Sequence, residues 1–222
     1  MRILLATGIY PPQIGGPAQY AKNLAAEFTK SGHLVRVLAY QWENKLPSGL
    51  RHGWFLARMI WAAPTSDFIL ALDTFSVGLP AIIAGKIMRR RVIIRTGGDF
   101  LWESYVERTG DLVLLKNFYQ INRKRWSFKE RLIFRLIRWE LRQATTMVFS
   151  TDWQRRIFFQ PYNLDLSRTK IIENYYGERG ENKVIGGDPF DKKIFISGTR
   201  KLKWKNKERL YRAFEIAQQT NP

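Results

Sequence analysis

The sequence has no cysteine and only two histidines, His33 and His52. The missing thiols exclude disulfide bonds, thiolate nucleophiles and zinc sites built from cysteine and histidine. No spacing of histidine and carboxylate residues suggests a mixed site, so we expect no bound metal. His52 falls within residues 41–53, which we interpret as a loop, and we expect a solvated side chain there rather than a catalyst.

Long hydrophobic runs are also missing. No apolar stretch approaches the roughly 18 residues that a membrane-spanning helix needs. The N-terminus passes directly into a short apolar run and lacks the long hydrophobic region and cleavage site of a signal peptide. We therefore expect a cytoplasmic protein, with peripheral contact with the inner face of the membrane as an open possibility.

Acidic residues are scarce relative to basic ones. The 222 residues include 19 Asp and Glu against 37 Lys and Arg, a formal net charge of +18. Such an excess favours nucleotides, nucleic acids or acidic lipid headgroups as partners, without choosing among them. The hydrophobic content of 45% is that of a folded globular chain and excludes general disorder.

The first forty residues predict a strand, a helix and a second strand. Residues 2–7 and 34–39 are short, mostly apolar runs typical of buried strands. Between them, apolar residues recur at helical spacing from Pro17 until Gly32, which should end the helix. Two parallel strands joined by a helix imply an α/β fold with a right-handed crossover.

Gly15 and Gly16 lie between the first strand and this helix. A glycine turn at a helix N-terminus leaves free N–H groups and the positive end of the helix dipole facing any ligand above it, which suits an anion. The spacing is not G-x-G-x-x-G, so a tight turn that binds nothing is an equal alternative.

The same alternation continues along the chain. Further strands are expected at residues 67–72, 92–94, 145–149 and 170–173. Helices are expected at residues 54–62, 77–88 and 153–159, the last capped by Thr151 or Asp152 and ended by Pro161. This rhythm predicts an α/β fold with a Rossmann-like doubly wound parallel sheet.

Ligands of such sheets bind beyond the carboxyl ends of the strands. This rule places Gly15 and Gly16, the turn at Asp73 and the second glycine turn, Gly97-Gly98-Asp99, around one crevice. The alternative role for both aspartates is to stabilise a turn or to cap a helix.

Residues 116–142 are the most basic part of the chain and predict an amphipathic helix. A solvated surface helix is one interpretation of it, and attachment to an anionic membrane surface is another. Nucleic-acid binding ranks third, because no recognised nucleic-acid motif accompanies the charges. The basic residues on one helical face are Arg131, Arg135, Arg138 and Arg142.

Residues 177–191 combine glycines, a proline and many charges, and they predict a linker. It separates an N-terminal domain, residues 1–176, from residues 192–222. The latter hold one predicted strand, 193–197, and one amphipathic helix, which cannot form a domain because one apolar face lacks a partner. We therefore expect an incomplete second domain, represented by its first βα unit.

Three segments resemble the N-terminal half of the retaining glycosyltransferases of family 4, which have the GT-B fold. The first is residues 3–16 with the helix after them, and the second is residues 148–174, ending at Asn174. The third and most specific, residues 198–206 with the sequence GTRKLKWKN, is similar to the G-R-x-x-x-x-K-N/G segment that opens the nucleotide-binding domain of that family.

The resemblance implies transfer of a sugar from a nucleotide-sugar donor to a glycan or lipid-linked acceptor, with retention, as in the synthesis of cell-envelope polysaccharides. It implies that Arg200 and Lys205 clamp the donor diphosphate beside Gly15 and Gly16, because fixed cations stabilise the charge of the leaving group. The acceptor would border the loop at Gly97, Gly98, Asp99 and Glu103. Neither a metal nor a cofactor is implied, since the two cations take that role.

The chain departs from the family pattern in three places. Many members have a histidine after the strand that here leads to Asp99, so Asp99 and Glu103 are the candidates to replace it, with Asp99 as the catalytic candidate. The N-G turn of the family becomes Asn174-Tyr175. The paired glutamates, E-x7-E, belong to a region beyond this chain, which alone should be a poor catalyst or none.

Two other functions compete with this one. A non-catalytic basic α/β module would bind an anionic membrane surface or nucleic acid, with strongly salt-dependent affinity. A dinucleotide-dependent oxidoreductase is disfavoured, because the first turn lacks G-x-G-x-x-G and the second predicted strand ends at Ala39-Tyr40-Gln41 without an acidic residue for the ribose.

Overall fold

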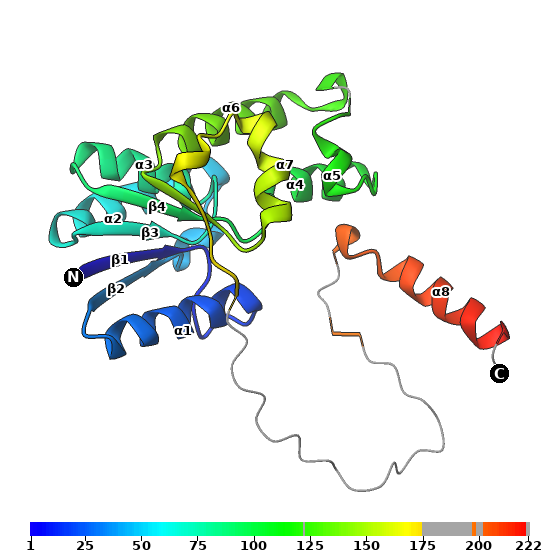
Figure 1. The fold of residues 1–222 in the computed structure, drawn as a ribbon, viewed down its shortest axis with the longest axis horizontal. Helices are drawn as coiled ribbons and strands as arrows, with labels where there is room; N and C mark the ends of the chain where they lie inside the picture. The colour runs from blue at the N-terminus through cyan, green and yellow to red at the C-terminus, as the bar shows by residue number, and fades with distance from the viewer. Residues whose placement is uncertain (122, 175–196, 199–201, 221–222) are drawn as a thin grey trace, which may run out of the picture.

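The computed structural model describes residues 1–121, 123–174, 197–198 and 202–220. Six parallel strands form one sheet within them, in the order β2-β1-β3-β4-β5-β6, with helices on its faces (Figure 1). The predicted α/β fold with a Rossmann-like doubly wound sheet is confirmed. The strands are β1 (Arg2–Thr7), β2 (Leu34–Ala39), β3 (Phe68–Ala71), β4 (Arg91–Arg95), β5 (Thr146–Phe149) and β6 (Thr169–Ile171).

The helices occupy the connections between the strands and the C-terminal segment. They are α1 (Gly16–Lys30), α2 (Ser48–Ala62), α3 (Gly78–Ile87), α4 (Phe100–Thr109), α5 (Leu115–Phe118), α6 (Phe128–Gln143), α7 (Asp152–Tyr162) and α8 (Lys207–Thr220). Short 3-10 turns η1 (Trp42–Lys45) and η5 (Lys203–Lys205) precede α2 and α8.

Strand β1 is central to the topology, because β2 and β3 pair with its two edges. The crossover from β1 to β2 runs in one direction across the sheet, and those from β2 through β6 run in the other. Right-handed crossovers therefore place α1 on one face and α2, α3, α6 and α7 on the opposite face. Figure 1 shows α1 separated from these helices by the sheet.

Both faces of β1 are buried. Ile3 and Leu5 pack with α1, whereas Leu4 and Ala6 belong to the larger core beneath α2, α3 and α6. A strand covered on both sides needs apolar residues at every position, which explains why residues 3–6 show no polar alternation.

The predicted loop at residues 41–53 is wrong from Ser48 onward. Helix α2 begins there, and the Arg51 N–H donates to the Pro47 carbonyl at 2.9 Å to close its first turn. Glycine in a helix costs only about 1 kcal/mol, and the later turns of α2 offset this cost by burying Phe55. His52 is therefore a half-buried helical residue rather than a solvated loop residue. The centre of its ring lies 5.4 Å from the centre of the Phe75 ring.

Helix α7 is longer than predicted. Thr151 caps it by accepting a hydrogen bond from the Gln154 N–H at 3.2 Å, as expected. Pro161 does not end it, because the helix continues to Tyr162, whose side chain is fully buried beside Phe158. The core contact of Tyr162 compensates for the hydrogen bond that the proline cannot donate.

The predicted linker, 177–191, and residues 193–196 of the predicted last strand lie outside the described residues. Helix α8 buries none of its residues, and Leu210 and Phe214 remain 51% and 37% exposed. The turn η5 contacts α4, since the Lys203 N–H donates to Glu107 Oε1 at 2.7 Å. All residues of α8 thus remain at least partly exposed in the described part of the chain.

Candidate functional site

The carboxyl ends of β1 and β3 form the switch point of the sheet. The loop after β1 leads to α1 on one face, whereas the loop after β3 leads to α3 on the other. The two loops therefore diverge above the strand ends, which is where α/β sheets bind their ligands. We call the region above the ends of β1 and β3 the crevice, as predicted from the sequence. The predicted location of the site thus coincides with the topological switch point.

The N-terminus of α1 forms one side of this crevice. Gly15 is the N-cap, with φ of +156°, and no side chain caps the helix. A Cβ at Gly15 would lie 3.3 Å from Ile9 Cδ1, whereas nothing lies within 4 Å of a Cβ at Gly16. The helix begins at Gly16, one residue before the predicted start, and its first turn offers N–H groups to an anion.

Arg95 lies at the carboxyl end of β4 and is 7% exposed. Its guanidinium carbon lies 3.9 Å from the centre of the Tyr20 ring of α1, and its Nη2 donates to Asn174 Oδ1, just after β6. Its Nε has no hydrogen-bond partner among the described residues. Arg95 therefore connects three elements and keeps one buried donor uncommitted.

Asp99 begins α4 and lies in the second glycine turn. Its Oδ1 accepts from the Trp102 N–H at 3.0 Å, so the helix-capping role is confirmed. Its Oδ2 accepts from the Tyr119 hydroxyl, which in turn lies 2.6 Å from the Tyr162 hydroxyl. Burial raises the pKa of Asp99 to about 6, although these hydrogen bonds oppose the increase.

The other residues predicted to border the acceptor gather around Asp99. A Cβ at Gly98 would lie 2.7 Å from Glu103 Oε1, so the glycine permits this carboxylate to approach the turn. A Cβ at Gly97 would lie 3.9 Å from Arg95 Nη1. The structure thus brings the glycine turn, Glu103 and the buried arginine together.

Asp73 follows β3, and the residue is partly exposed. Its Oδ1 accepts from the Thr74 N–H at 2.8 Å, which is a turn role. Burial and the nearby charge of Asp99 raise the pKa of Asp73 to about 6, against the opposing influence of the Thr74 N–H and Arg95. A carboxyl with such a pKa can accept a proton near neutral pH.

Glu140 of α6 is a third acidic residue close to Asp73. It is fully buried, and its Oε2 accepts from the Phe75 N–H at 2.9 Å. Its pKa is raised well above the ordinary value, chiefly by burial and also by Asp73. A Cβ at Gly78 would lie 2.0 Å from Glu140 Oε1, so this glycine is required where the carboxyl meets α3.

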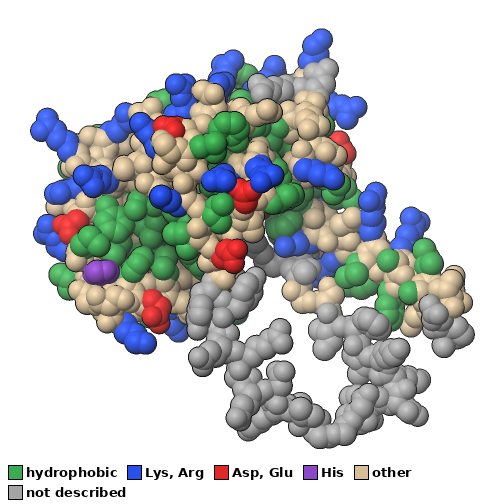
Figure 2. Space-filling view, in the orientation of Figure 1, with side chains coloured by type: hydrophobic (Ala, Val, Ile, Leu, Met, Phe, Trp, Pro, Cys, Tyr) green, Lys and Arg blue, Asp and Glu red, His purple; other side chains and the backbone are tan. Residues whose placement is uncertain are grey.

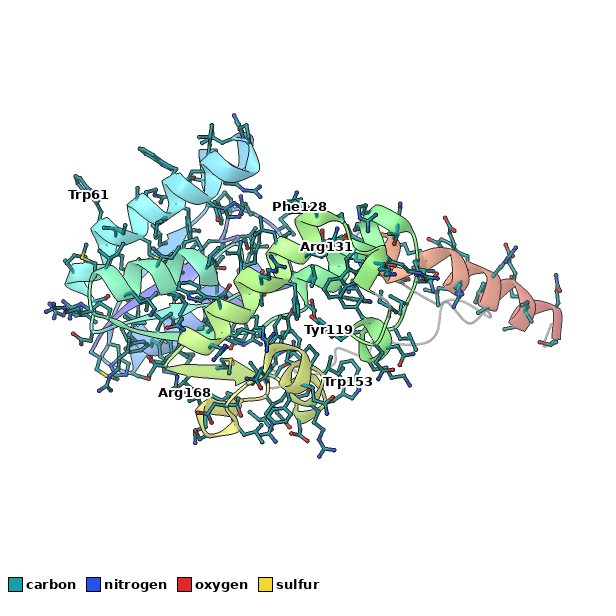
Figure 3. All side chains as sticks on the ribbon, turned by 90° about the horizontal axis from the view of Figure 1, so that it is seen from above. Trp61, Tyr119, Phe128, Arg131, Trp153 and Arg168 are labelled. Carbon is teal, nitrogen blue, oxygen red and sulfur yellow. The ribbon has the colours of Figure 1, made fainter. Side chains whose placement is uncertain are left out.

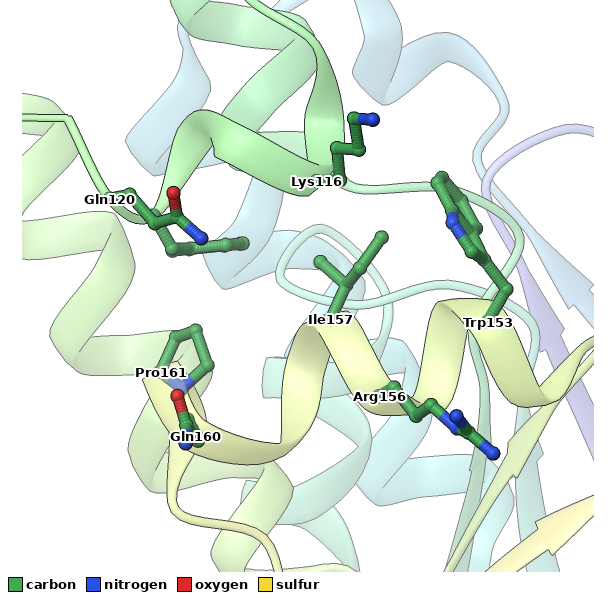
Figure 4. A pocket seen from close by; sticks show the side chains of 8 residues that line it. Lys116, Gln120, Trp153, Arg156, Ile157, Gln160 and Pro161 are labelled. Carbon is green, nitrogen blue, oxygen red and sulfur yellow. The ribbon is translucent and has the colours of Figure 1, made fainter.

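A polar hollow of about 440 Å³ lies beside this network, between α5 and α7 (Figure 4). Tyr119, which binds Asp99, forms part of its lining. Trp153 and Ile157 project from α7 toward the space, with Lys116 and Gln120 on the opposite side. A second hollow of about 630 Å³ shares Lys116 and Trp153 with the first and extends to Trp102 and Trp204.

The residues predicted to clamp the diphosphate do not assemble in the described part of the chain. Arg200 lies outside the described residues. Lys205 lies in η5, where its Nζ is 4.1 Å from the centre of the Trp204 ring, which packs against Trp102 of α4. No atom of Lys205 comes within 4 Å of a Cβ built at Gly15 or Gly16.

The predicted basic face is present on α6. Arg131, Arg135, Arg138 and Arg142 are all exposed along it, on the side of the helix away from the core. They are separate from the crevice network, whose charged groups are Asp73, Asp99, Glu140 and Arg95.

Sequence reasoning missed Arg95, Tyr119 and Glu140. The signal for Arg95 was present, because an arginine that directly follows the apolar run 92–94 must end up at the carboxyl edge of a buried strand. Glu140 gave no comparable signal. Its place on the buried side of a basic helix is visible only once the direction of α6 is known.

No group of metal-binding side chains and no helix long and apolar enough to cross a membrane is found among the residues that the structure describes. Comparison with models of known protein families and with curated proteins gives no match for this chain.

Proposed function

We propose that this chain is the acceptor-side part of a sugar transferase, which moves a sugar from a nucleotide-sugar to a glycan or lipid-linked acceptor. The observation that carries the proposal is the group of residues at the switch point. There the uncapped first turn of α1 and the partly exposed Asp73 follow the neighbouring strands β1 and β3, and the buried Arg95 ends β4 beside them. The resemblance to family 4 glycosyltransferases supplies the nucleotide-sugar as donor.

The proposed reaction assigns a task to each group. The bond from the anomeric carbon to the donor phosphate oxygen breaks, and the diphosphate leaves with the electron pair. An acceptor hydroxyl oxygen bonds to that carbon and releases its proton, which Asp73 is suited to accept. The N–H groups after Gly15 are suited to the charge of the diphosphate, and Arg200 and Lys205 would complete its clamp by the resemblance.

The two aspartates differ in availability. Both carboxylate oxygens of Asp99 accept hydrogen bonds from its own domain, and its side chain is 2% exposed. Asp73 is partly exposed, and its Oδ1 accepts from the neighbouring Thr74 N–H. We therefore assign proton transfer to Asp73 and give Asp99 the task of positioning the glycine turn beside the acceptor.

We place the reaction at the cytoplasmic face of a membrane, in the synthesis of a cell-envelope polysaccharide. The net charge of +18 and the exposed arginines of α6 support this location, because they attract the chain to acidic lipids. No metal or cofactor takes part in the proposed reaction.

Titration calorimetry of the chain with uridine and guanosine diphosphate sugars tests the proposal. We expect Gly15→Ala to weaken donor binding at least tenfold, since alanine is strained at φ of +156° and disturbs the first turn of α1. Arg200→Ala should weaken it comparably. Gly53→Ala is the matched control, because a Cβ there has nothing within 4 Å. Unchanged donor affinity in both site variants contradicts the assigned phosphate site.

The same titration separates the proposed function from its competitor. A non-catalytic basic module would bind acidic surfaces and would ignore nucleotide-sugars. A folded chain that binds acidic vesicles but no nucleotide-sugar of either kind therefore favours the module over the transferase.

A further inference from the structure

Helices α2, α3 and α6 lie side by side over one face of the sheet, with α3 between the other two (Figure 3). We call their solvent side the outer helix face. Its charge and its exposed apolar side chains set it apart from the rest of the molecule. None of these side chains belongs to the crevice.

The outer helix face has no exposed carboxylate. Helices α2 and α3 contain no Asp or Glu. The two glutamates of α6, Glu130 and Glu140, are 3% and 0% exposed, and Arg108 holds Glu130 through two hydrogen bonds of 2.8 Å. The basic residues of these helices are Arg51, Arg58, Lys86, Lys129, Arg131, Arg135, Arg138 and Arg142. Figure 2 shows Lys and Arg side chains along the margin where α3 and α6 lie.

Large apolar side chains stand between these cations on α6. Phe128, Leu132 and Trp139 recur at helical spacing and are 78%, 46% and 39% exposed. Lys86 of α3 lies over the Trp139 ring at 5.8 Å, so cation and ring are neighbours across the two helices. Because a solvated helix gains nothing from exposing these side chains, the stripe indicates a surface that becomes covered.

Helix α2 carries a second stripe of the same kind. Leu50, Trp54 and Trp61 are 65%, 46% and 86% exposed, and Trp61 projects away from its neighbours in Figure 3. The two tryptophans border an apolar hollow of about 480 Å³ against β2, with Arg36 and Arg58 at its rim.

We propose that the outer helix face docks on a lipid bilayer that contains acidic lipids. Tryptophan and phenylalanine partition into the headgroup region, and basic residues around them bind the lipid phosphates. The absence of exposed carboxylates gives the charge complementarity. A nucleic acid would match the cations but would leave the apolar stripes of α2 and α6 uncovered, so the bilayer fits better.

This docking brings the crevice close to the bilayer. Helix α6 runs antiparallel to the strands and therefore begins on the carboxyl side of the sheet, so Phe128 lies on the side of the crevice. The inference rests on the proposed function in one respect: docking would give the site access to a lipid-linked acceptor. The docking itself requires no sugar transfer.

Co-sedimentation with vesicles tests the docking, with phosphatidylcholine alone compared with equal parts of phosphatidylcholine and phosphatidylglycerol. We expect the chain to bind only the acidic vesicles. Each basic residue near an acidic surface contributes about fivefold to binding, so Arg131→Glu with Arg135→Glu should weaken it by more than about 25-fold. Trp54→Ser with Trp61→Ser should weaken it about tenfold or more, because their buried apolar area is lost.

Two controls carry matched changes elsewhere. Lys22→Glu with Lys30→Glu alters the same charge on α1, across the sheet, and Trp153→Ser removes an exposed tryptophan of α7. Both should bind acidic vesicles nearly as the unmodified chain does. Circular dichroism checks that every variant remains folded.

Three results would overturn the docking: equal binding to neutral and acidic vesicles, equal losses in the α1 control, or no loss in the tryptophan pair. Binding of a single-stranded oligonucleotide that matches the acidic vesicles in affinity and ignores the tryptophan change would assign the face to nucleic acid instead. Donor titration of the same variants is independent of these outcomes, so a failed docking leaves the transferase proposal standing, and the reverse holds too.

Discussion

The crevice and the outer helix face both depend on charged residues, yet they hold them differently. In the crevice, Arg95, Asp99 and Glu140 are nearly or fully buried, and each meets defined partners. On the outer helix face the arginines of α6 are exposed, and both glutamates of that helix are buried.

The difference determines what each charge can do. Burial removes water from the crevice groups, so their pKa values shift and the loss of one group affects the others. The charges of exposed arginines are screened by water and salt, so each contributes little to the free energy of folding. Together they can attract a negatively charged partner. Substitutions in the crevice should therefore change stability, whereas those on α6 should change binding alone.

The largest effect is expected from Arg95→Leu. The change removes the contact with Asn174 and the positive charge that lowers the pKa of Asp73. We expect the free energy of unfolding to fall by about 3 kcal/mol, measured by urea denaturation. Arg135→Leu on α6 is the matched control. Equal losses in both variants would remove the distinction between the two regions.

Asp73→Asn should change the pH dependence of the unfolding free energy, by nearly as much as Arg95→Leu changes the unfolding free energy itself. The raised pKa of Asp73, about 6, means that the folded chain keeps a proton that the unfolded chain releases near pH 4. Its contribution to stability therefore falls as the pH rises from about 4 to about 6, and it stays low above that. Asparagine does not titrate. The free energy of unfolding of the variant should therefore rise by about 2 kcal/mol relative to that of the unmodified chain between about pH 4 and about pH 6.

Urea denaturation of both chains at several pH values between 4 and 7 measures this gain. The pKa values of Asp99 and Glu140 are raised too, so the variant should keep a slope of the same sign, reduced by the share of Asp73. Parallel stability curves for the two chains would show that Asp73 titrates as an ordinary surface carboxyl.

Tyr119→Phe should have a moderate effect. It removes the hydroxyl that donates to Asp99 and leaves a buried oxygen without its donor. We expect a loss of about 1.5 kcal/mol in unfolding free energy, together with a further increase in the pKa of Asp99. Tyr211→Phe is the control, because Tyr211 is 59% exposed on α8. A loss no greater than that of the control would mean that the tyrosine and Asp99 are not coupled.

The smallest effect is expected from Arg131→Ala with Arg135→Ala. Both side chains are exposed, so the unfolding free energy should change by no more than about 0.5 kcal/mol for each. Thermal unfolding in the absence of vesicles measures this. A loss comparable to that of Arg95→Leu would show that these arginines stabilise the fold rather than bind a partner.

The agreement between pattern and structure was best where the signal was local. The apolar runs at residues 2–7 and 34–39 became strands with the same bounds. Asp99 and Thr151 cap their helices, each as one of two alternatives that the sequence had left open. Local signals failed where burial outweighed them. Gly53 and Pro161 mark breaks in the sequence, yet the helices continue through both because Phe55 and Tyr162 are buried in the core.

The sequence by itself determined the classes of element, the parallel sheet and the glycine-opened N-terminus of α1. These depend on residue periodicity and on turn chemistry, both of which act over a few neighbouring positions. Only the tertiary structure decided that β1 lies between β2 and β3, since all the strands carry the same apolar signal. It also decided that Arg95 meets Asn174, 79 positions away. A charged side chain is removed from water in this way only when the whole sheet has assembled around it.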